Sequence, residues 1–84
     1  MKTAFVTGAT AGIGEATVRA LVAGGWRCVA TGRRKERLDA LVAELGADKV
    51  CPAVFDVRDE AAMDAAIAGL PEDFAAIDLL VNNA

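Results

Sequence analysis

The sequence predicts an α/β fold in which a parallel β-sheet carries helices on both faces. Short apolar runs rich in β-favouring residues alternate along the chain with longer segments whose apolar residues recur at helical spacing. Apolar residues make up 55% of the 84 residues, yet aromatic residues make up only 5%. This composition suits strands that are buried on both sides, and strands separated by helices pair in parallel through right-handed crossovers.

The amino-terminal elements follow this alternation. TAFVT at 3–7 predicts a strand, and GIGEATVRALVAGG at 12–25 predicts a helix that closes at its glycine pair. WRCVATG at 26–32 predicts the second strand. KERLDALVAELG at 35–46 predicts the next helix, because its leucines and valine share one face and Gly46 provides a stop signal.

The remaining elements complete the series. KVCPAVFD at 49–56 predicts a third strand, although Pro52 is unfavourable in a strand that must donate hydrogen bonds on both sides. A helix is expected at 58–70, opened by acidic residues that suit its positive end, then a turn at 71–74 and a fourth strand at 77–81. The resulting βαβαβαβ series is a half-Rossmann architecture with strand order 3-2-1-4.

Charge and cysteine content exclude several classes of function. The net charge of −3 and the isoelectric point near 4.7 argue against a nucleic-acid or anionic-membrane partner. Cys28 and Cys51 are too few for a disulfide framework or a metal site, and their apolar surroundings predict buried thiols in a reducing cytoplasm. MKTAFVTG at the amino terminus lacks the apolar length of a signal peptide or a spanning helix.

The glycine-rich stretch TGATAGIG at 7–14 indicates a ligand site, because it joins the first strand to the first helix at the carboxyl edge of the sheet. Gly8 is expected to permit the turn off the strand, Gly12 to let backbone approach a ligand, and Gly14 to let the helix pack closely. A Cβ at any of the three would intrude. The amides at the helix start favour a phosphate, and no Gly-Lys-Ser/Thr sequence follows that would indicate a phosphate-loop NTPase.

TGATAGIG, together with FDV at 55–57 and NNA at 82–84, resembles the amino-terminal half of a classical short-chain dehydrogenase/reductase, a family of NAD(P)-dependent oxidoreductases. The resemblance covers the whole chain. It implies that the cofactor diphosphate and its ribose lie against Gly8, Thr10, Ala11, Gly12, Ile13 and Gly14. It places the adenine near Asp56 and Val57, and gives Asn82, Asn83 and Ala84 a role in lining the nicotinamide-side ribose or steadying the strand. Ala11 departs from the family pattern, in which many members carry Ser.

The segment TGRRKER at 31–37 indicates which nicotinamide cofactor is bound. NAD-binding sheets carry an acidic residue about 20 positions after the glycines, where it bonds the adenosine ribose. Here no carboxylate occurs at 31–35, and cations stand there instead. Because a guanidinium matches a phosphate, we expect NADP(H), with Arg33 and Arg34 ahead of Lys35 at the 2′-phosphate. A solvated helix start is the alternative interpretation.

The resemblance implies hydride transfer between a nicotinamide and a small-molecule carbonyl or alcohol, with a Tyr as general acid/base and a Lys nearby. The chain contains no Tyr, so we expect no catalytic residue in it. Residues 1–84 are interpreted as the dinucleotide-binding part of a longer Rossmann domain, inactive alone. One alternative is an isolated or engineered fragment that binds nucleotide or self-associates; another is a regulatory or scaffold domain. An apolar edge at the fourth strand favours a homo-oligomer.

Overall fold

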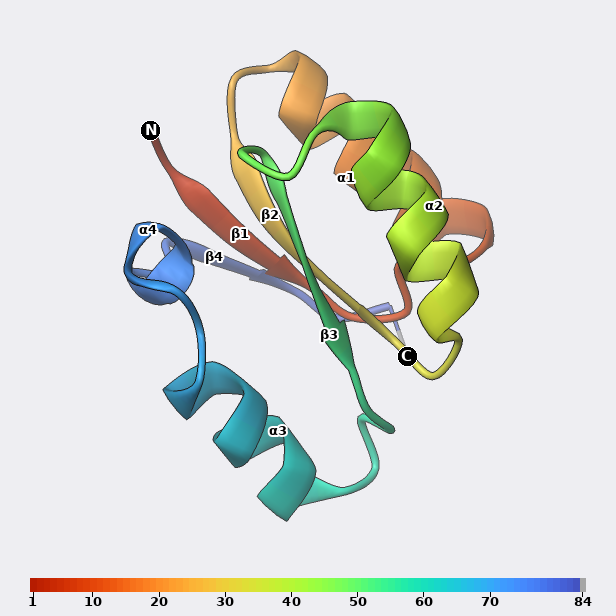
Figure 1. Ribbon diagram of the computed structural model, residues 1–84, viewed down its shortest axis with the longest axis vertical. Coiled ribbons are helices and arrows are strands. Elements are labelled where there is room, and N and C mark those ends of the chain that lie inside the picture. Colours follow the sequence, from red (N-terminus) through yellow and green to blue (C-terminus); the bar gives the residue numbers. More distant parts are fainter. Residues whose placement is uncertain (84) are drawn as a thin grey trace.

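The computed structural model describes residues 1–83 and contains a four-stranded parallel sheet with the order β3-β2-β1-β4 (Figure 1). The predicted fold class and strand order are confirmed. The elements in chain order are β1 (Thr3–Val6), α1 (Gly12–Ala23), β2 (Arg27–Gly32), α2 (Lys35–Leu45), β3 (Val50–Val54), α3 (Glu60–Ala68), α4 (Glu72–Ala75) and β4 (Leu79–Val81).

Helices cover both faces of the sheet. In Figure 1, α1 and α2 lie on one side of the strands and α3 and α4 on the other. Successive side chains of a strand point to opposite faces, and two separate clusters result. The cluster under α1 and α2 includes Ala4, Val6, Cys28 and Ala30, while the other includes Phe5, Val29, Phe55 and Phe74. This arrangement explains why the strands are apolar at consecutive positions rather than at alternate ones.

The predicted turn at 71–74 is wrong in part, because a short helix, α4, begins within it. Pro71 precedes the helix, and Glu72 and Asp73 lie in its first turn, where acidic side chains are favourable. Phe74 is buried in the second cluster, against the sheet. A single turn of helix is too short to show a periodic pattern, so the sequence offers no signal for it.

Helix α3 begins at Glu60, two residues after the predicted start at residue 58. Asp59 has extended backbone and its side chain accepts a hydrogen bond of 3.1 Å from the Ala62 N–H. This is the N-cap interaction that satisfies a free amide of the first helical turn. The acidic residues at the helix start therefore act partly as a cap and not only through the helix dipole.

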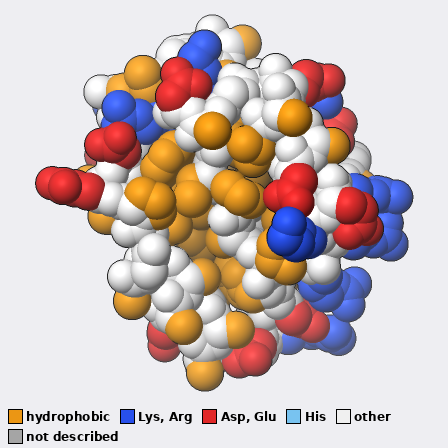
Figure 2. Space-filling view, viewed as in Figure 1, with side chains coloured by type: hydrophobic (Ala, Val, Ile, Leu, Met, Phe, Trp, Pro, Cys, Tyr) orange, Lys and Arg blue, Asp and Glu red, His pale blue; other side chains and the backbone are white. Residues whose placement is uncertain are grey.

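Strand β3 forms one edge of the sheet, which accounts for Pro52. It pairs only with β2, where Pro52 lies opposite Ala30, and an edge strand needs hydrogen bonds on one side alone. Figure 2 shows hydrophobic side chains gathered over the middle of the face where β3 runs in Figure 1. At the opposite edge, Leu79 and Leu80 of β4 are 39% and 57% exposed.

The two cysteines lie on neighbouring strands but belong to different clusters. Cys28 is buried with the residues under α1 and α2, whereas Cys51 is half-buried on the other face. Both are free thiols, and burial raises the pKa of the Cys28 thiol to about 11. The expectation of buried thiols is thus met fully at Cys28 and partly at Cys51. Within the described residues, no helix has the length and apolar character needed to cross a membrane.

Candidate functional site

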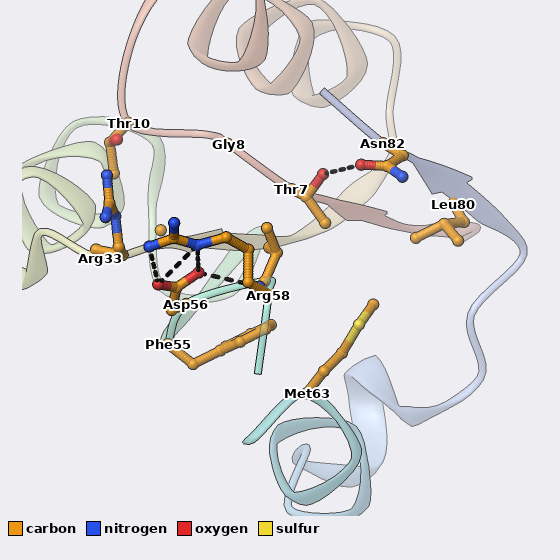
Figure 3. Close-up of a pocket in the computed structure, with 12 residues that line it drawn as sticks. Thr7, Gly8, Thr10, Arg33, Phe55, Asp56, Arg58, Met63, Leu80 and Asn82 are labelled. Carbon is orange, nitrogen blue, oxygen red and sulfur yellow. Dashed lines mark hydrogen bonds and ion pairs between the residues drawn. The ribbon is translucent and has the colours of Figure 1, made fainter. Parts of the chain in front are cut away.

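A cavity of about 640 Å³ opens at the carboxyl ends of the strands (Figure 3). It lies where the chain order of the sheet reverses between β1 and β4, the position at which open parallel sheets bind ligands. Its lining combines the glycine-rich turn, the ends of β2 and β3, one residue of α3, and β4. The residues are Thr7, Gly8, Thr10, Gly32, Arg33, Phe55, Asp56, Val57, Arg58, Met63, Leu80 and Asn82.

Glycine is required at different positions of the turn for different physical reasons. Gly8 and Gly12 adopt φ angles of +61° and +58°, in the left-handed region that other residues rarely enter. The expectation that a Cβ would intrude at all three glycines is correct only for Gly14, where it would overlap the carbonyl oxygen of Gly8. At Gly12 no described atom lies within 4 Å of that position, and at Gly8 the nearest is Asn83 Cβ at an ordinary 3.5 Å.

The start of α1 faces outward without a side-chain cap. Ala11 occupies the N-cap position with extended backbone, where Ser would supply an oxygen to the first amides. Ala11 and Gly12 are exposed, and Ile13 is 76% exposed. Of the residues assigned to the diphosphate by resemblance, Gly8 and Thr10 therefore line the cavity and Gly14 is buried. The other three form the open helix start beside it.

Thr7 joins the ends of β1 and β4. Its hydroxyl donates to Asn82 Oδ1 at 3.0 Å and accepts from the backbone N–H of Asn83 at 2.9 Å. The Asn83 side-chain amide also donates to the Thr7 carbonyl at 3.2 Å. Asn83 is thus hydrogen-bonded to the end of β1, while Asn82 lines the cavity (Figure 3). Ala84, the third residue of this motif, lies outside the described residues.

The basic cluster after β2 divides between the cavity and solvent. Arg33 lines the cavity. Arg34 is exposed at the N-cap of α2 and is not part of the lining. Lys35 forms an ion pair with Asp39 one helical turn away, at 2.6 Å. Of the cations predicted at the 2′-phosphate, Arg33 alone is placed by the structure in the cavity wall.

Asp56 and Val57 follow β3 and both line the cavity. Asp56 is held by Arg58, whose Nη2 lies 2.8 Å from Asp56 Oδ2 and whose backbone N–H donates to Oδ1 at 3.0 Å. These bonds, with a further contribution from the positive charge of Arg33, keep the pKa of Asp56 well below its usual range. The carboxylate is therefore ionised throughout the neutral pH range.

Sequence reasoning missed two polar or backbone features of the cavity. The sequence analysis assigns no role to Arg58, although an acid followed two residues later by arginine directly after a strand indicates the pair. Gly32 is predicted only as a strand residue, but a Cβ there would lie 2.5 Å from Thr10 Cγ2. Gly32 therefore allows the glycine-rich turn to approach the end of β2. The apolar lining residues Phe55, Met63 and Leu80 carry no local sequence signal, since the tertiary fold brings them together.

Comparison with known proteins decides the family. The family model described as short chain dehydrogenase matches residues 2–84. This chain belongs to that family. Serine 3-dehydrogenase from Agrobacterium fabrum is 52% identical over 82 residues, a match covering 98% of this chain and 32% of the relative. The NADP-dependent 3-hydroxy acid dehydrogenase YdfG of Salmonella typhi is 53% identical over 80 residues, covering 95% and 32%.

Solved structures of other short chain dehydrogenases resemble the chain closely. A closed form of serine dehydrogenase complexed with NADP⁺ superimposes with a TM-score of 0.94 at 49% identity, covering 98% of this chain and 33% of the other. Serine dehydrogenase from Escherichia coli gives a TM-score of 0.93 at 49% identity, with 98% and 38% covered. The chain thus spans about a third of the length of the curated relatives it matches.

Proposed function

We propose that this chain is the NADP(H)-binding part of an oxidoreductase that moves hydride between a nicotinamide and a carbonyl or alcohol. The observation that carries the proposal is the cavity wall, where Arg33 follows β2 in the place at which NAD-binding sheets carry an acid. Relatives about 50% identical to this chain are named as NADP-dependent dehydrogenases, which supports the same cofactor.

The residues of the cavity fit such a cofactor. The positive φ of Gly8 and Gly12 and the uncapped start of α1 present backbone amides, which suit a diphosphate. In the proposal, Thr10, Ala11 and Ile13 surround that group and Gly14 keeps the helix close to the turn. Arg33 holds the 2′-phosphate and Arg34 adds positive charge from the start of α2.

The remaining lining residues would orient the two ends of the cofactor. Asp56 and Val57 would contact the adenine, and Asn82 and Asn83 would contact the nicotinamide-side ribose. The same role is proposed for Ala84, which lies outside the described residues. The bound cofactor supplies or accepts the hydride. The chain has no Tyr, so we assign the proton transfer at the substrate oxygen to residues outside these 84. The proposal accordingly treats residues 1–84 as the dinucleotide-binding part of a longer domain and expects no turnover from the chain alone.

Titration of the purified chain with NADPH and with NADH tests the cofactor assignment. Hydrogen bonds to charged groups contribute about 1.5–3 kcal/mol, so NADPH should bind roughly 10- to 100-fold more tightly than NADH. Isothermal calorimetry is the suitable method, because Trp26 precedes β2 and lies at the opposite end of that strand from the cavity. The absence of binding to either nucleotide would refute the proposal. Equal or tighter binding of NADH would refute the role of Arg33.

A further inference from the structure

Asp56 is the only carboxylate among the described residues that line the cavity. Such a group is poorly suited to a site for a phosphorylated ribose. An ionised carboxylate accepts hydrogen bonds from ribose hydroxyls, which favours NAD, and it repels a phosphate. The two arginines of the same wall, Arg33 and Arg58, offset this charge, but of the two only Arg58 forms an ion pair with Asp56 within the described residues.

Arg58 reaches back over Asp56 and occupies both carboxylate oxygens (Figure 3). Its Nε lies 3.1 Å from Oδ1 and its Nη2 lies 2.8 Å from Oδ2, a two-pronged geometry that Lys could not reproduce. The Arg58 side chain is 79% exposed and the Asp56 side chain 33%. An exposed pair of this kind adds little to folding stability, which points to a role in the cavity instead.

Arg33 and Asp56 both line the cavity (Figure 3), and the charge of Arg33 also contributes to lowering the pKa of Asp56. If Arg58 did not occupy Asp56, the carboxylate could pair with Arg33. The Asp56 carboxylate and a bound phosphate would then compete for the Arg33 guanidinium. With Arg58 in place, no ion pair of Arg33 occurs within residues 1–83. The pair Asp56–Arg58 thus leaves a net positive charge on the wall, carried by Arg33.

We propose that Arg58 is a positioning residue that determines cofactor specificity: by occupying the Asp56 carboxylate, it keeps Arg33 available for a 2′-phosphate and so favours NADP over NAD. This inference rests on the proposed function. Arg58 lies outside the glycine turn and outside the basic cluster after β2, so the inference adds a residue to the proposed cofactor site. Asp56 then has a second role, in cofactor specificity, besides facing the adenine.

The test compares the dissociation constants of NADP⁺ and NAD⁺ for the 84-residue chain and its variants by calorimetry. Arg58→Gln should weaken NADP⁺ binding by about tenfold and change NAD⁺ binding by less than about twofold. In an Asp56→Asn background, Arg58→Gln should change NADP⁺ binding by less than about twofold, because the carboxylate it acts through is gone. Lys49→Gln is the matched control, since it removes one exposed cation just before β3, at the other end of that strand from the cavity.

Three outcomes would overturn the inference. Equal weakening of NADP⁺ and NAD⁺ in Arg58→Gln would indicate a structural role, and a fall in NADP⁺ affinity that persists in the Asp56→Asn background would indicate direct contact with the phosphate. A similar fall in Lys49→Gln would indicate a general charge effect. Circular dichroism checks that each variant folds. Arg58→Lys, which keeps the charge but not the two-pronged geometry, serves as a second variant and should lose less of the preference than Arg58→Gln. If the unaltered chain binds neither NADP⁺ nor NAD⁺, the proposed function is refuted instead.

Discussion

Replacing Gly14 by Ala tests whether the contact between α1 and the glycine turn limits the stability of the fold. The new Cβ would overlap the Gly8 carbonyl oxygen, and both partners belong to backbone. The turn cannot recede freely, because Thr7 N–H bonds the Val81 carbonyl and Ala9 N–H bonds the Thr31 carbonyl, each at 2.9 Å. Relief therefore requires a shift of α1 or the loss of a hydrogen bond between neighbouring strand ends.

Three contributions determine the expected change in the free energy of unfolding. Overpacking costs about 1–3 kcal/mol and a lost backbone hydrogen bond about 1 kcal/mol, while Ala in place of Gly in a helix returns about 1 kcal/mol. We expect Gly14→Ala to lower the free energy of unfolding by about 1–3 kcal/mol, which is a large part of the stability of a small domain. The melting temperature should fall by about 5–20 °C.

Thermal and urea unfolding followed by circular dichroism measure the effect. Gly24→Ala is the matched control, because Gly24 caps the other end of α1 with a φ of −85° and its added Cβ would meet the nearest atoms at an ordinary 3.5 Å. That variant should stay within about 1 kcal/mol of the unaltered chain. If Gly14→Ala and Gly24→Ala unfold at the same urea concentration, the overlap does not constrain the helix and the steric reasoning is wrong.

Three further predictions concern the cavity and the sheet edge. Thr7→Val should destabilise the chain by about 1–2 kcal/mol because it leaves the Asn83 N–H without its hydroxyl acceptor. The control is Thr17→Val, which removes a hydroxyl that bonds the Ile13 carbonyl within α1 and joins no strands, and equal urea midpoints would contradict the assignment. Arg58→Gln should raise the pKa of Asp56 toward its ordinary value of about 4, as followed by NMR titration. The small stabilising effect of this exposed pair is present above that ordinary value and is lost as the pH falls through the lowered pKa of the folded state. An unchanged Asp56 titration in the variant would show that the ion pair does not form in solution. Self-association through the β4 edge should weaken in Leu79→Lys, since a charge on an exposed apolar edge opposes pairing; sedimentation velocity measures it, and an oligomer of undiminished stability would place the interface elsewhere.

Much of the fold could be predicted because the signals are local. The apolar runs, the helical spacing of the leucines in α2 and the glycines that end the helices each require only neighbouring residues, and all four strands were placed within two residues of their observed bounds. The alternation of strands and helices then predicts a parallel sheet, and the half-Rossmann architecture predicts its strand order. Helix α4 escaped prediction because one turn has no period, and its position depends on burying Phe74 against the sheet.

The candidate site shows the same division. The glycine turn, Arg33, Asp56 and Asn82 were recognisable from motifs, and the tertiary structure brings all four segments to one cavity. Arg33 and Arg34 were both predicted at the 2′-phosphate, but only Arg33 lines the cavity. Consecutive residues after the end of a strand point in different directions.

Residue type and spacing along the chain are enough to predict the alternating elements, the glycine turn and the absence of an acid at 31–35. The packed fold was needed to show that Gly14 is required by the Gly8 carbonyl, that Gly32 makes room for Thr10, and that Arg58 rather than Arg33 holds Asp56. These relations join residues whose positions are set by strand pairing and by the direction of each side chain. The cavity therefore forms only when the ends of the four strands come together, and no single motif predicts it.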